Sequence, residues 1–224
     1  PAFGFVEHSQ EWRGARPIRP LRQILTHQTR NWKLAPRLVR NYMWSRRKDL
    51  HPGPEWKVEE LAPESMSSDL FSDLLSKDIG EAMFSPRPPA FFEYLARCPA
   101  AKFTLYGISR AGRREGHFTL AQIRGQARVA GVWLRDPNLE NWRAVYGLAQ
   151  QAAAGIKGVY EITVTGTAGP SAEAAAQSGL RVTPGPPVYL LNKKGKFTAP
   201  DNFQFQLSDG DLAFLDTGEA AYWT

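Results

Sequence analysis

The fold is decided by residues 117–134, which read HFTLAQIRGQARVAGVWL, and by the RDPNLE that follows at residues 135–140. Apolar side chains alternate with others through the first half of this stretch and again at residues 128–134, with Gly125-Gln126 in between. Such alternation predicts two half-buried strands joined by a tight turn. A third alternating run precedes them at residues 102–109, followed by an expected hairpin loop at residues 111–116. We therefore expect three consecutive antiparallel strands.

The residues after this meander alternate between helical and strand patterns. Asp136-Pro137 is a helix-start signal, with a capping acid and then proline at the first helical position. From Leu139 apolar residues recur every three to four positions until Gly155, which predicts a long helix. A β-rich segment at residues 159–165 predicts a central strand, and an alanine-rich helix is expected at residues 170–178.

The flanking segments complete the expected order of elements. We expect a strand at residues 56–61, a helix that begins after Ser67 or Ser68, a helix around Phe91, Phe92 and Leu95, and strands at residues 187–192 and 203–207. The order from residue 55 is then β, α, α, β, β, β, α, β, α, β, β. This order is typical of a mixed sheet with helices on both faces.

Positive charge is concentrated in the first fifty residues. They hold 11 lysines and arginines against 3 acids, a net charge of +8, whereas the other 174 residues hold 17 against 19, a net charge of −2. The chain has a basic pI of about 9.6 because of this segment. Any preference for negatively charged partners is therefore expected of this segment alone. Because His51-Pro-Gly-Pro54 breaks the chain, we place a basic, helical N-terminal arm at residues 1–54 and one domain at residues 55–224.

The composition excludes several classes of protein. With 42% hydrophobic and 22% charged residues, the chain is ordinary for a globular protein and too apolar for a disordered one. No apolar run approaches the roughly 18 residues that span a bilayer. The single cysteine, Cys98, excludes an intrachain disulfide, and with four scattered histidines it offers no metal-ligand spacing. We expect a metal-free, cytoplasmic protein.

The order of elements resembles that of GNAT acetyltransferase domains. The resemblance is carried by residues 118–134, by the helix from Leu139, by Val159-Tyr-Glu-Ile-Thr163 and by residues 172–180 with the strand after them. It is similar in particular to the GNAT-like domains grouped with FemAB-type bacterial proteins, which often occur in tandem. The resemblance implies an α/β (mixed α+β) domain with a central mixed, mostly antiparallel sheet flanked by helices.

The resemblance also implies an acyl donor, acetyl-CoA or another acyl-CoA. In the family the strand before the long helix holds the pantetheine through its backbone, and the helix N-terminus binds the diphosphate. The residues at these positions are Val132, Trp133, Leu134, Arg135 and Asn138. The diphosphate loop is degenerate, because Asn138 and Glu140 replace small residues and Pro137 removes an N–H donor.

Three further positions bear on catalysis. A general base in this fold is often a glutamate on a central strand, and Glu161 is the only acid within residues 159–165; burial would have to raise its pKa toward neutrality. Arg87 lies in a proline-rich loop that often lines the acceptor site in the family, so it is the candidate substrate-binding residue. A tyrosine that protonates the thiolate in many members would stand four residues before Gly179, where this chain has Ala175.

The basic arm has three interpretations. It could bind nucleic acid through residues 13–48, where aromatic side chains are interleaved among arginines. It could lie on an anionic membrane, as basic amphipathic helices do. It could instead pack its apolar stripe on a preceding GNAT-like domain or on a second copy of the chain. We favour the third, because Gly4-Phe-Val-Glu7 resembles a strand that belongs to something already begun.

The sequence therefore predicts an N-acyltransferase that moves an acyl group from acyl-CoA to an amine by direct attack. Two alternatives belong to other classes. One is a non-catalytic GNAT-fold module that binds a ligand or serves as a partner domain of a larger protein. The other is a FemAB-like transferase that uses an aminoacyl-tRNA donor, for which the basic arm would supply phosphate contacts.

Overall fold

The computed structural model describes residues 5–26, 32, 34–46, 52–62, 85, 87–167, 169–191, 203–210, 213 and 222–224. The helix expected after Ser67 or Ser68 lies outside these residues.

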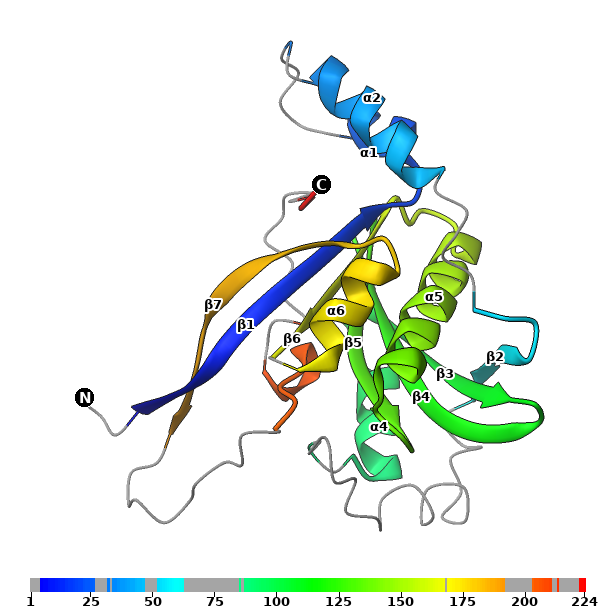
Figure 1. Cartoon of the computed structure of the whole chain (residues 1–224), viewed down its shortest axis with the longest axis vertical. Helices are drawn as coiled ribbons and strands as arrows, with labels where there is room; N and C mark the ends of the chain where they lie inside the picture. Colours follow the sequence, from blue (N-terminus) through cyan, green and yellow to red (C-terminus); the bar gives the residue numbers. More distant parts are fainter. Residues whose placement is uncertain are drawn as a thin grey trace.

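A seven-stranded sheet in the order β2-β3-β4-β5-β6-β1-β7 is the centre of the fold (Figure 1). The strands are β1 (Phe5–Pro17), β2 (Trp56–Leu61), β3 (Lys102–Arg110), β4 (Arg113–Ile123), β5 (Gln126–Leu134), β6 (Glu161–Gly166) and β7 (Arg181–Leu191). All neighbouring strands are antiparallel except β5 and β6, which are parallel. The expected mixed, mostly antiparallel sheet is thus confirmed.

Helices cover both faces of the sheet. The described helices are α1 (Pro20–Leu25), α2 (Leu34–Ser45), α4 (Pro89–Ala96), α5 (Leu139–Gly155), α6 (Pro170–Gln177) and the short 3-10 helix η3 (Leu207–Asp209). Figure 1 shows α5 and α6 in front of the sheet and α4 behind it, with α1 and α2 at the top beyond the end of β1. The helices expected after Leu139 and at residues 170–178 are confirmed.

The meander forms where the alternation predicts it, with tighter turns than expected. Residues 111–116 were expected to form a hairpin loop, but β3 and β4 are joined directly by Ala111 and Gly112. Both residues have positive φ angles, 48° and 84°, as the two central residues of a type I′ turn require. The turn between β4 and β5 repeats this geometry at Arg124 and Gly125.

The main core lies between the sheet and α5. Trp142, Val145, Tyr146 and Ala149 of α5 form one buried cluster with sheet residues that include Phe118. These helix positions are three and four residues apart, so a single stripe of α5 faces the strands. On the opposite face, Phe92 of α4 packs with Leu105 of β3 in a smaller cluster.

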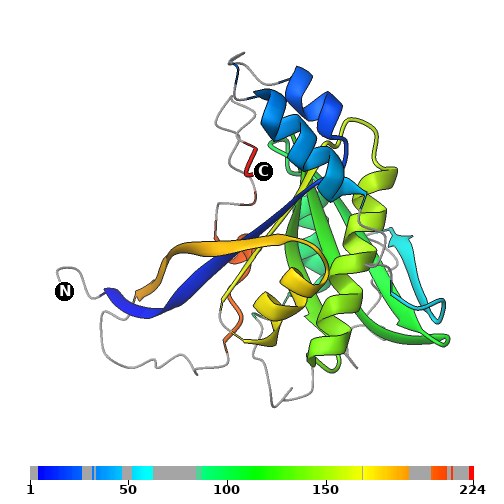
Figure 2. The same ribbon diagram turned by 45° about the horizontal axis from the view of Figure 1, so that its top comes forward.

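Strand β1 belongs to this sheet and not to a separate arm. It pairs with β6 from Trp12 to Pro17 and with β7 along most of its length, and the β1–β7 ribbon extends beyond the other strands (Figure 2). Trp12 is buried against Tyr146 of α5 and donates its indole N–H to the Thr167 carbonyl over 2.9 Å. The boundary at residue 54 therefore does not divide the sheet, because residues on both sides of it build the same core.

Two local expectations are wrong. Residues 203–207 do not form a strand, because residues 204–206 have no regular structure and η3 begins at Leu207. The strand beside β6 on its outer side is β1. The helix after the meander is capped by Asn138 and not by Asp136. Asn138 Oδ1 accepts the backbone N–H of Asn141 over 2.9 Å, so α5 starts at Leu139.

Candidate functional site

The two parallel strands at the centre of the sheet separate partway along their length. β5 and β6 are paired only from Gln126–Glu161 to Val129–Val164. The register between β4 and β5 then shifts, since Leu120 pairs with Val129 and Thr119 with Gly131, which leaves Ala130 as a bulged residue. Beyond the bulge β5 diverges from β6, and its edge is open to other partners.

Residues 203–209, which we call the C-terminal segment, fill this cleft. The side-chain amide of Gln206 accepts the Val132 N–H over 3.0 Å and donates to the Val132 carbonyl over 2.5 Å. Ser208 donates to the Ala130 carbonyl over 2.6 Å. A Cβ on Gly131 would lie 3.1 Å from both Gln206 Oε1 and Ser208 Oγ, so any larger residue would push these two side chains back by a few tenths of an ångström.

The other wall of the cleft holds the same segment through Thr167, just after β6. Its hydroxyl donates to the Phe203 carbonyl over 2.9 Å and accepts the Phe205 N–H over 3.2 Å. The space left between the walls is only about 10 Å³, about enough for one water molecule. The cleft is therefore closed in this conformation.

Three hydroxyl side chains line the remaining space: Tyr146 from α5, Thr165 from β6 and Ser171 from α6. Tyr146 is fully buried, and burial raises its pKa above the ordinary range, opposed by a hydrogen bond with Ser171. The Tyr146 hydroxyl therefore stays protonated at neutral pH and can act as a hydrogen-bond donor within the cleft.

A charged pair closes the cleft on the α4 side. Arg87 donates to Asp209 Oδ1 over 2.7 Å, and both side chains are about nine-tenths buried. Burial lowers the pKa of Arg87, and Asp209 opposes that shift. The guanidinium also lies over the Phe91 ring, 5.0 Å from its centroid. Arg87 thus lies at the cleft, and its charge is matched by Asp209 of the C-terminal segment; that it binds substrate stays a prediction.

His117 of β4 lies close behind this pair. Its ring stacks on Trp133 at 6.1 Å and meets Phe92 edge-on at 5.5 Å. Burial lowers the pKa of His117 to about 3, and the nearby charges of Arg87 and Arg114 contribute to the shift. The imidazole is therefore neutral at physiological pH.

Glu161 lies at the other end of the β5–β6 pairing, opposite Gln126 and away from the cleft. Its Oε1 accepts hydrogen bonds from Gln126 Nε2 (3.1 Å) and Trp223 N (2.8 Å). Its Oε2 accepts from Gln23 Nε2 (2.7 Å) and from the Oγ1 (2.7 Å) and N (3.2 Å) of Thr224. Burial raises the pKa of Glu161, and these hydrogen bonds oppose the shift. The carboxyl group joins α1, β5 and residues 223–224; that it is also the base stays a prediction.

The N-terminus of α5, the expected diphosphate site, is occupied by its own side chains. Asn138 caps it, and Asn138 Nδ2 donates to Asp136 Oδ2 over 2.7 Å. Glu140 in the first turn forms an ion pair with Arg110 at 2.9 Å, and Arg135 donates to the Arg114 carbonyl. Two carboxylates and a satisfied cap do not favour a diphosphate at this helix end.

The structure thus brings together only part of the predicted set. Val132 and Arg87 meet at the cleft, while the Trp133 side chain lies on the α4 face and Leu134 is fully buried. Sequence reasoning missed Gln206 and Asp209. The sequence held one signal, because Phe203-Gln-Phe-Gln206 alternates phenylalanine with glutamine. The structure buries both glutamines, Gln204 and Gln206.

Two searches of the described ranges found nothing. No group of three histidine, cysteine, aspartate or glutamate side chains there could hold a metal ion. No helix there has the length and apolar character needed to cross a bilayer.

Comparison with known proteins finds a likeness in fold only. No protein-family model and no curated protein matches the sequence. Among solved structures, a conserved Enterococcus faecalis protein named as a probable N-acyltransferase is similar, with a TM-score of 0.51 and 9% identity over 84% of this chain and 40% of that chain. A GCN5-related N-acetyltransferase from Sphaerobacter thermophilus has a TM-score of 0.44 and 11% identity over 81% and 50%.

The chain shares with the Enterococcus faecalis protein a fold with a mixed, mostly antiparallel sheet flanked by helices. At these identities the likeness concerns the fold alone, and the chain spans only 40% to 50% of the length of these two relatives. The FemAB-type grouping stays a prediction.

Proposed function

We propose that this chain is an N-acyltransferase of the GNAT type, with an acyl-CoA as donor and an amine as acceptor. One observation carries the proposal: beyond the bulge, the N–H and C=O of Val132 face the cleft and are bonded by a side-chain amide, Gln206. A pantetheine amide offers the same donor and acceptor, so the edge of β5 suits both partners.

In the proposed reaction the amine nitrogen attacks the thioester carbonyl carbon. A C–N bond forms, the C–S bond breaks, and the electron pair leaves with the CoA sulfur as a thiolate. The Tyr146 hydroxyl, which stays protonated, would donate a hydrogen bond to that developing charge. The proton released by the amine passes to water in the cleft. Glu161 is our prediction for the base from the sequence alone, and it lies at the other end of β6, with both oxygens already bonded.

The acceptor would approach from the α4 side, where Arg87 and Asp209 meet. Withdrawal of the C-terminal segment would separate the pair and leave Arg87 close to Gly131. A guanidinium at this position would suit an amine acceptor that also carries a carboxylate or phosphate.

The proposal requires the C-terminal segment to move before the donor binds. Gln206 and Ser208 occupy three backbone groups of β5 that an extended ligand would need. The free energy that holds the C-terminal segment in the cleft must be supplied when the donor binds, and this weakens the apparent affinity for the donor.

Calorimetric titration with acetyl-CoA tests this proposal. Gln206→Ala should bind acetyl-CoA about tenfold more tightly than the wild type, because it removes two hydrogen bonds that compete with the ligand. Gln177→Ala is the matched control, since Gln177 is exposed on α6 and bonds only Glu173 among the described contacts. If neither the wild type nor Gln206→Ala binds at millimolar acetyl-CoA, the proposal is wrong.

That negative result would favour a second candidate, a GNAT-fold module without acyl transfer. The filled cleft and the self-capped N-terminus of α5 both support it. In such a module the C-terminal segment would be a permanent part of the core, and Gln206→Ala would lower stability without creating a binding site.

A further inference from the structure

We propose that α1, α2 and Trp32 between them form a docking surface for anionic lipid bilayers. We call the described residues 20–26, 32 and 34–46 the basic hairpin. The argument does not depend on acyl transfer, since the hairpin lies at the opposite end of β6 from the cleft (Figure 1).

The outward face of α2 is apolar. Val39, Tyr42 and Met43 are 60%, 46% and 69% exposed, and their spacing of three and four residues places them on one face. Arg46 continues the same face and lies over the Tyr42 ring, 4.4 Å from its centroid. The inward face is held by Asn41, which is buried.

The rest of the basic hairpin extends this apolar surface. Leu21 and Leu25 of α1 are more than half exposed, and Trp32 in the connection is 80% exposed. Of the ten large hydrophobic residues that the described part of the chain exposes, six belong to the hairpin. Such clustering marks an interaction site and not scattered surface residues.

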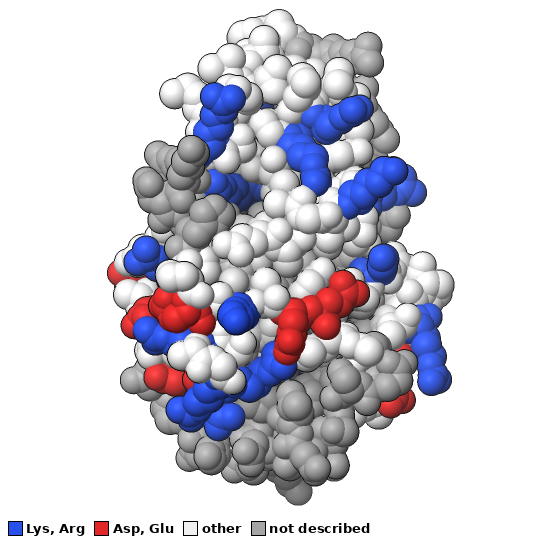
Figure 3. All heavy atoms as spheres, turned by 90° about the vertical axis from the view of Figure 1, so that its right-hand side faces the viewer, with Lys and Arg blue, Asp and Glu red and all other residues white. Residues whose placement is uncertain are grey.

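The charge of the hairpin is of one sign. The hairpin contains Arg22, Arg37, Arg40 and Arg46 and no aspartate or glutamate, and the longer stretch of residues 12–48 contains eleven lysines and arginines and no acid. Figure 3 shows lysine and arginine side chains without acidic neighbours over the upper part of the surface, whereas acidic side chains gather lower down. A second copy of this face would be repelled, while an anionic lipid surface is attracted both by the charge and by the apolar side chains.

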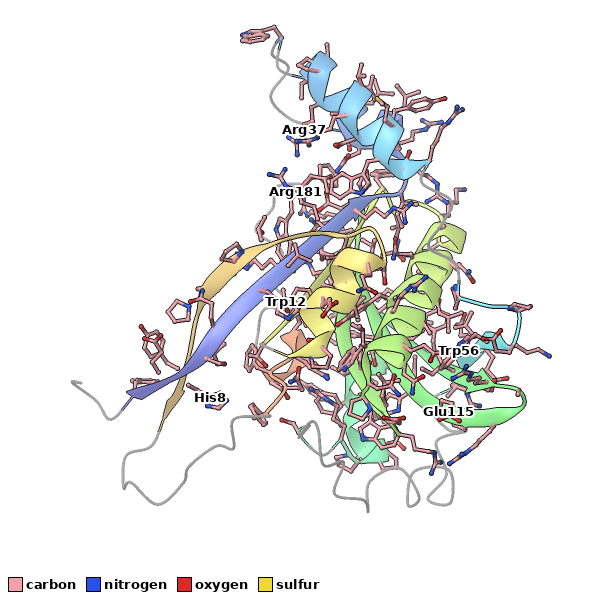
Figure 4. All side chains as sticks on the ribbon, viewed as in Figure 1. His8, Trp12, Arg37, Trp56, Glu115 and Arg181 are labelled. Carbon is pink, nitrogen blue, oxygen red and sulfur yellow. The ribbon has the colours of Figure 1, made fainter. Side chains whose placement is uncertain are left out.

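An open hollow of about 700 Å³ lies beside α2 and reaches the edge of its outward face at Met43; it is also lined by Arg40, Trp44, Leu180 and Arg181. Burial and the charges of Arg181 and Arg37 lower the pKa of Arg40, so both guanidiniums are close enough to repel that of Arg40. Figure 4 shows Arg37 and Arg181 between α2 and the β1–β7 ribbon. A phosphate headgroup here would relieve that repulsion while its acyl chains meet the outward face.

The hairpin is fixed to the domain, which makes the surface preformed. Gln23 of α1 donates to Glu161 and to Thr224, and Asn41 of α2 donates to Gln23 over 3.0 Å. Trp44 donates its indole N–H to the Gly179 carbonyl over 2.7 Å. The exposed residues can therefore be changed without loosening these contacts.

The experiment is co-sedimentation of the full chain with sucrose-loaded vesicles at roughly 0.1 M salt. Vesicles of phosphatidylcholine with about 30% phosphatidylglycerol should bind the chain, and pure phosphatidylcholine should not. The variant Val39→Ser/Met43→Ser should lower the partition coefficient about tenfold or more, because it removes two apolar side chains that would become buried in the bilayer. Arg40→Gln should lower it about fivefold, the loss expected for one arginine near an anionic surface.

Tyr94→Ser is the matched control, because Tyr94 is equally exposed on α4, far from the hairpin in the fold, and should bind as the wild type does. Circular dichroism checks that each variant is folded. The proposal is overturned if binding ignores lipid charge, or if Val39→Ser/Met43→Ser binds as the wild type does. It is also overturned if single-stranded RNA binds the hairpin and anionic vesicles do not, or if the same variant only abolishes a dimer.

Discussion

Acidification should destabilise this protein through His117, a buried imidazole that must become charged. Its side chain is 6% exposed, between the rings of Phe92 and Trp133, with the charges of Arg87 and Arg114 close by. The pKa falls from an ordinary 6.5 to about 3 in the folded state. The folded protein then binds fewer protons than the unfolded chain, so this contribution is fully present above pH 6.5 and is lost as the pH falls toward 3.

The magnitude follows from these two pKa values. Between pH 7 and pH 5 the unfolded histidine takes up nearly one proton while the folded one takes up almost none, which lowers the free energy of unfolding by about 2 kcal/mol. Urea unfolding of the wild type and of His117→Gln at both pH values isolates this term, since the carboxylates titrate alike in both proteins. The free energy of unfolding should fall by about 2 kcal/mol less in the variant. An equal fall in both proteins would refute the reasoning.

The remaining predictions concern two buried charges. Glu161→Gln should lower the free energy of unfolding by about 2–4 kcal/mol, because an amide NH₂ in place of either oxygen faces at least two donors; a loss below about 1 kcal/mol in urea unfolding would contradict this. Arg87→Met should cost about 3 kcal/mol, because Asp209 is left buried without its cation, and the double variant Arg87→Met/Asp209→Leu should recover part of that loss. Equal loss in the single and double variants would argue against the ion pair.

Much of the sheet could be predicted from the sequence because its pattern is local. The alternation in residues 117–134 and the tight turn at Gly125 need only neighbouring residues to be recognised, and the structure confirms both. The α5 stripe through Trp142 and Tyr146 is equally local, with a period that only a helix matches.

The position of β1 could not be predicted in this way. Arg13 pairs with Thr165 and with Thr183, so the pairing joins residues about 150 and 170 positions apart. Nothing within residues 5–17 identifies those partners. The expected strand at residues 203–207 also failed because of distant contacts, since this segment is bonded through side chains to Val132 and Thr167 and not paired as a strand.

The candidate site was predicted only where backbone position decides it. Val132 lies at the cleft because its backbone follows the bulge at Ala130, where β5 separates from β6, and this holds for any side chain at that position. The contacts of Gln206 and Asp209 depend on how residues 203–209 cross the cleft, and no spacing rule predicts that path. The cap of α5 was misassigned because aspartate and asparagine are equally good N-caps, and the sequence offers both, at Asp136 and Asn138.

Amide hydrogen exchange at Val132 tests the central claim most directly, because this N–H is the group that Gln206 and the acyl donor would share. In an isotope-labelled sample of Gln206→Ala the Val132 amide should exchange faster than in the wild type, and added acetyl-CoA should slow it again. If acetyl-CoA leaves the exchange of Val132 unchanged in Gln206→Ala, the edge of β5 is not the donor site and the account is contradicted.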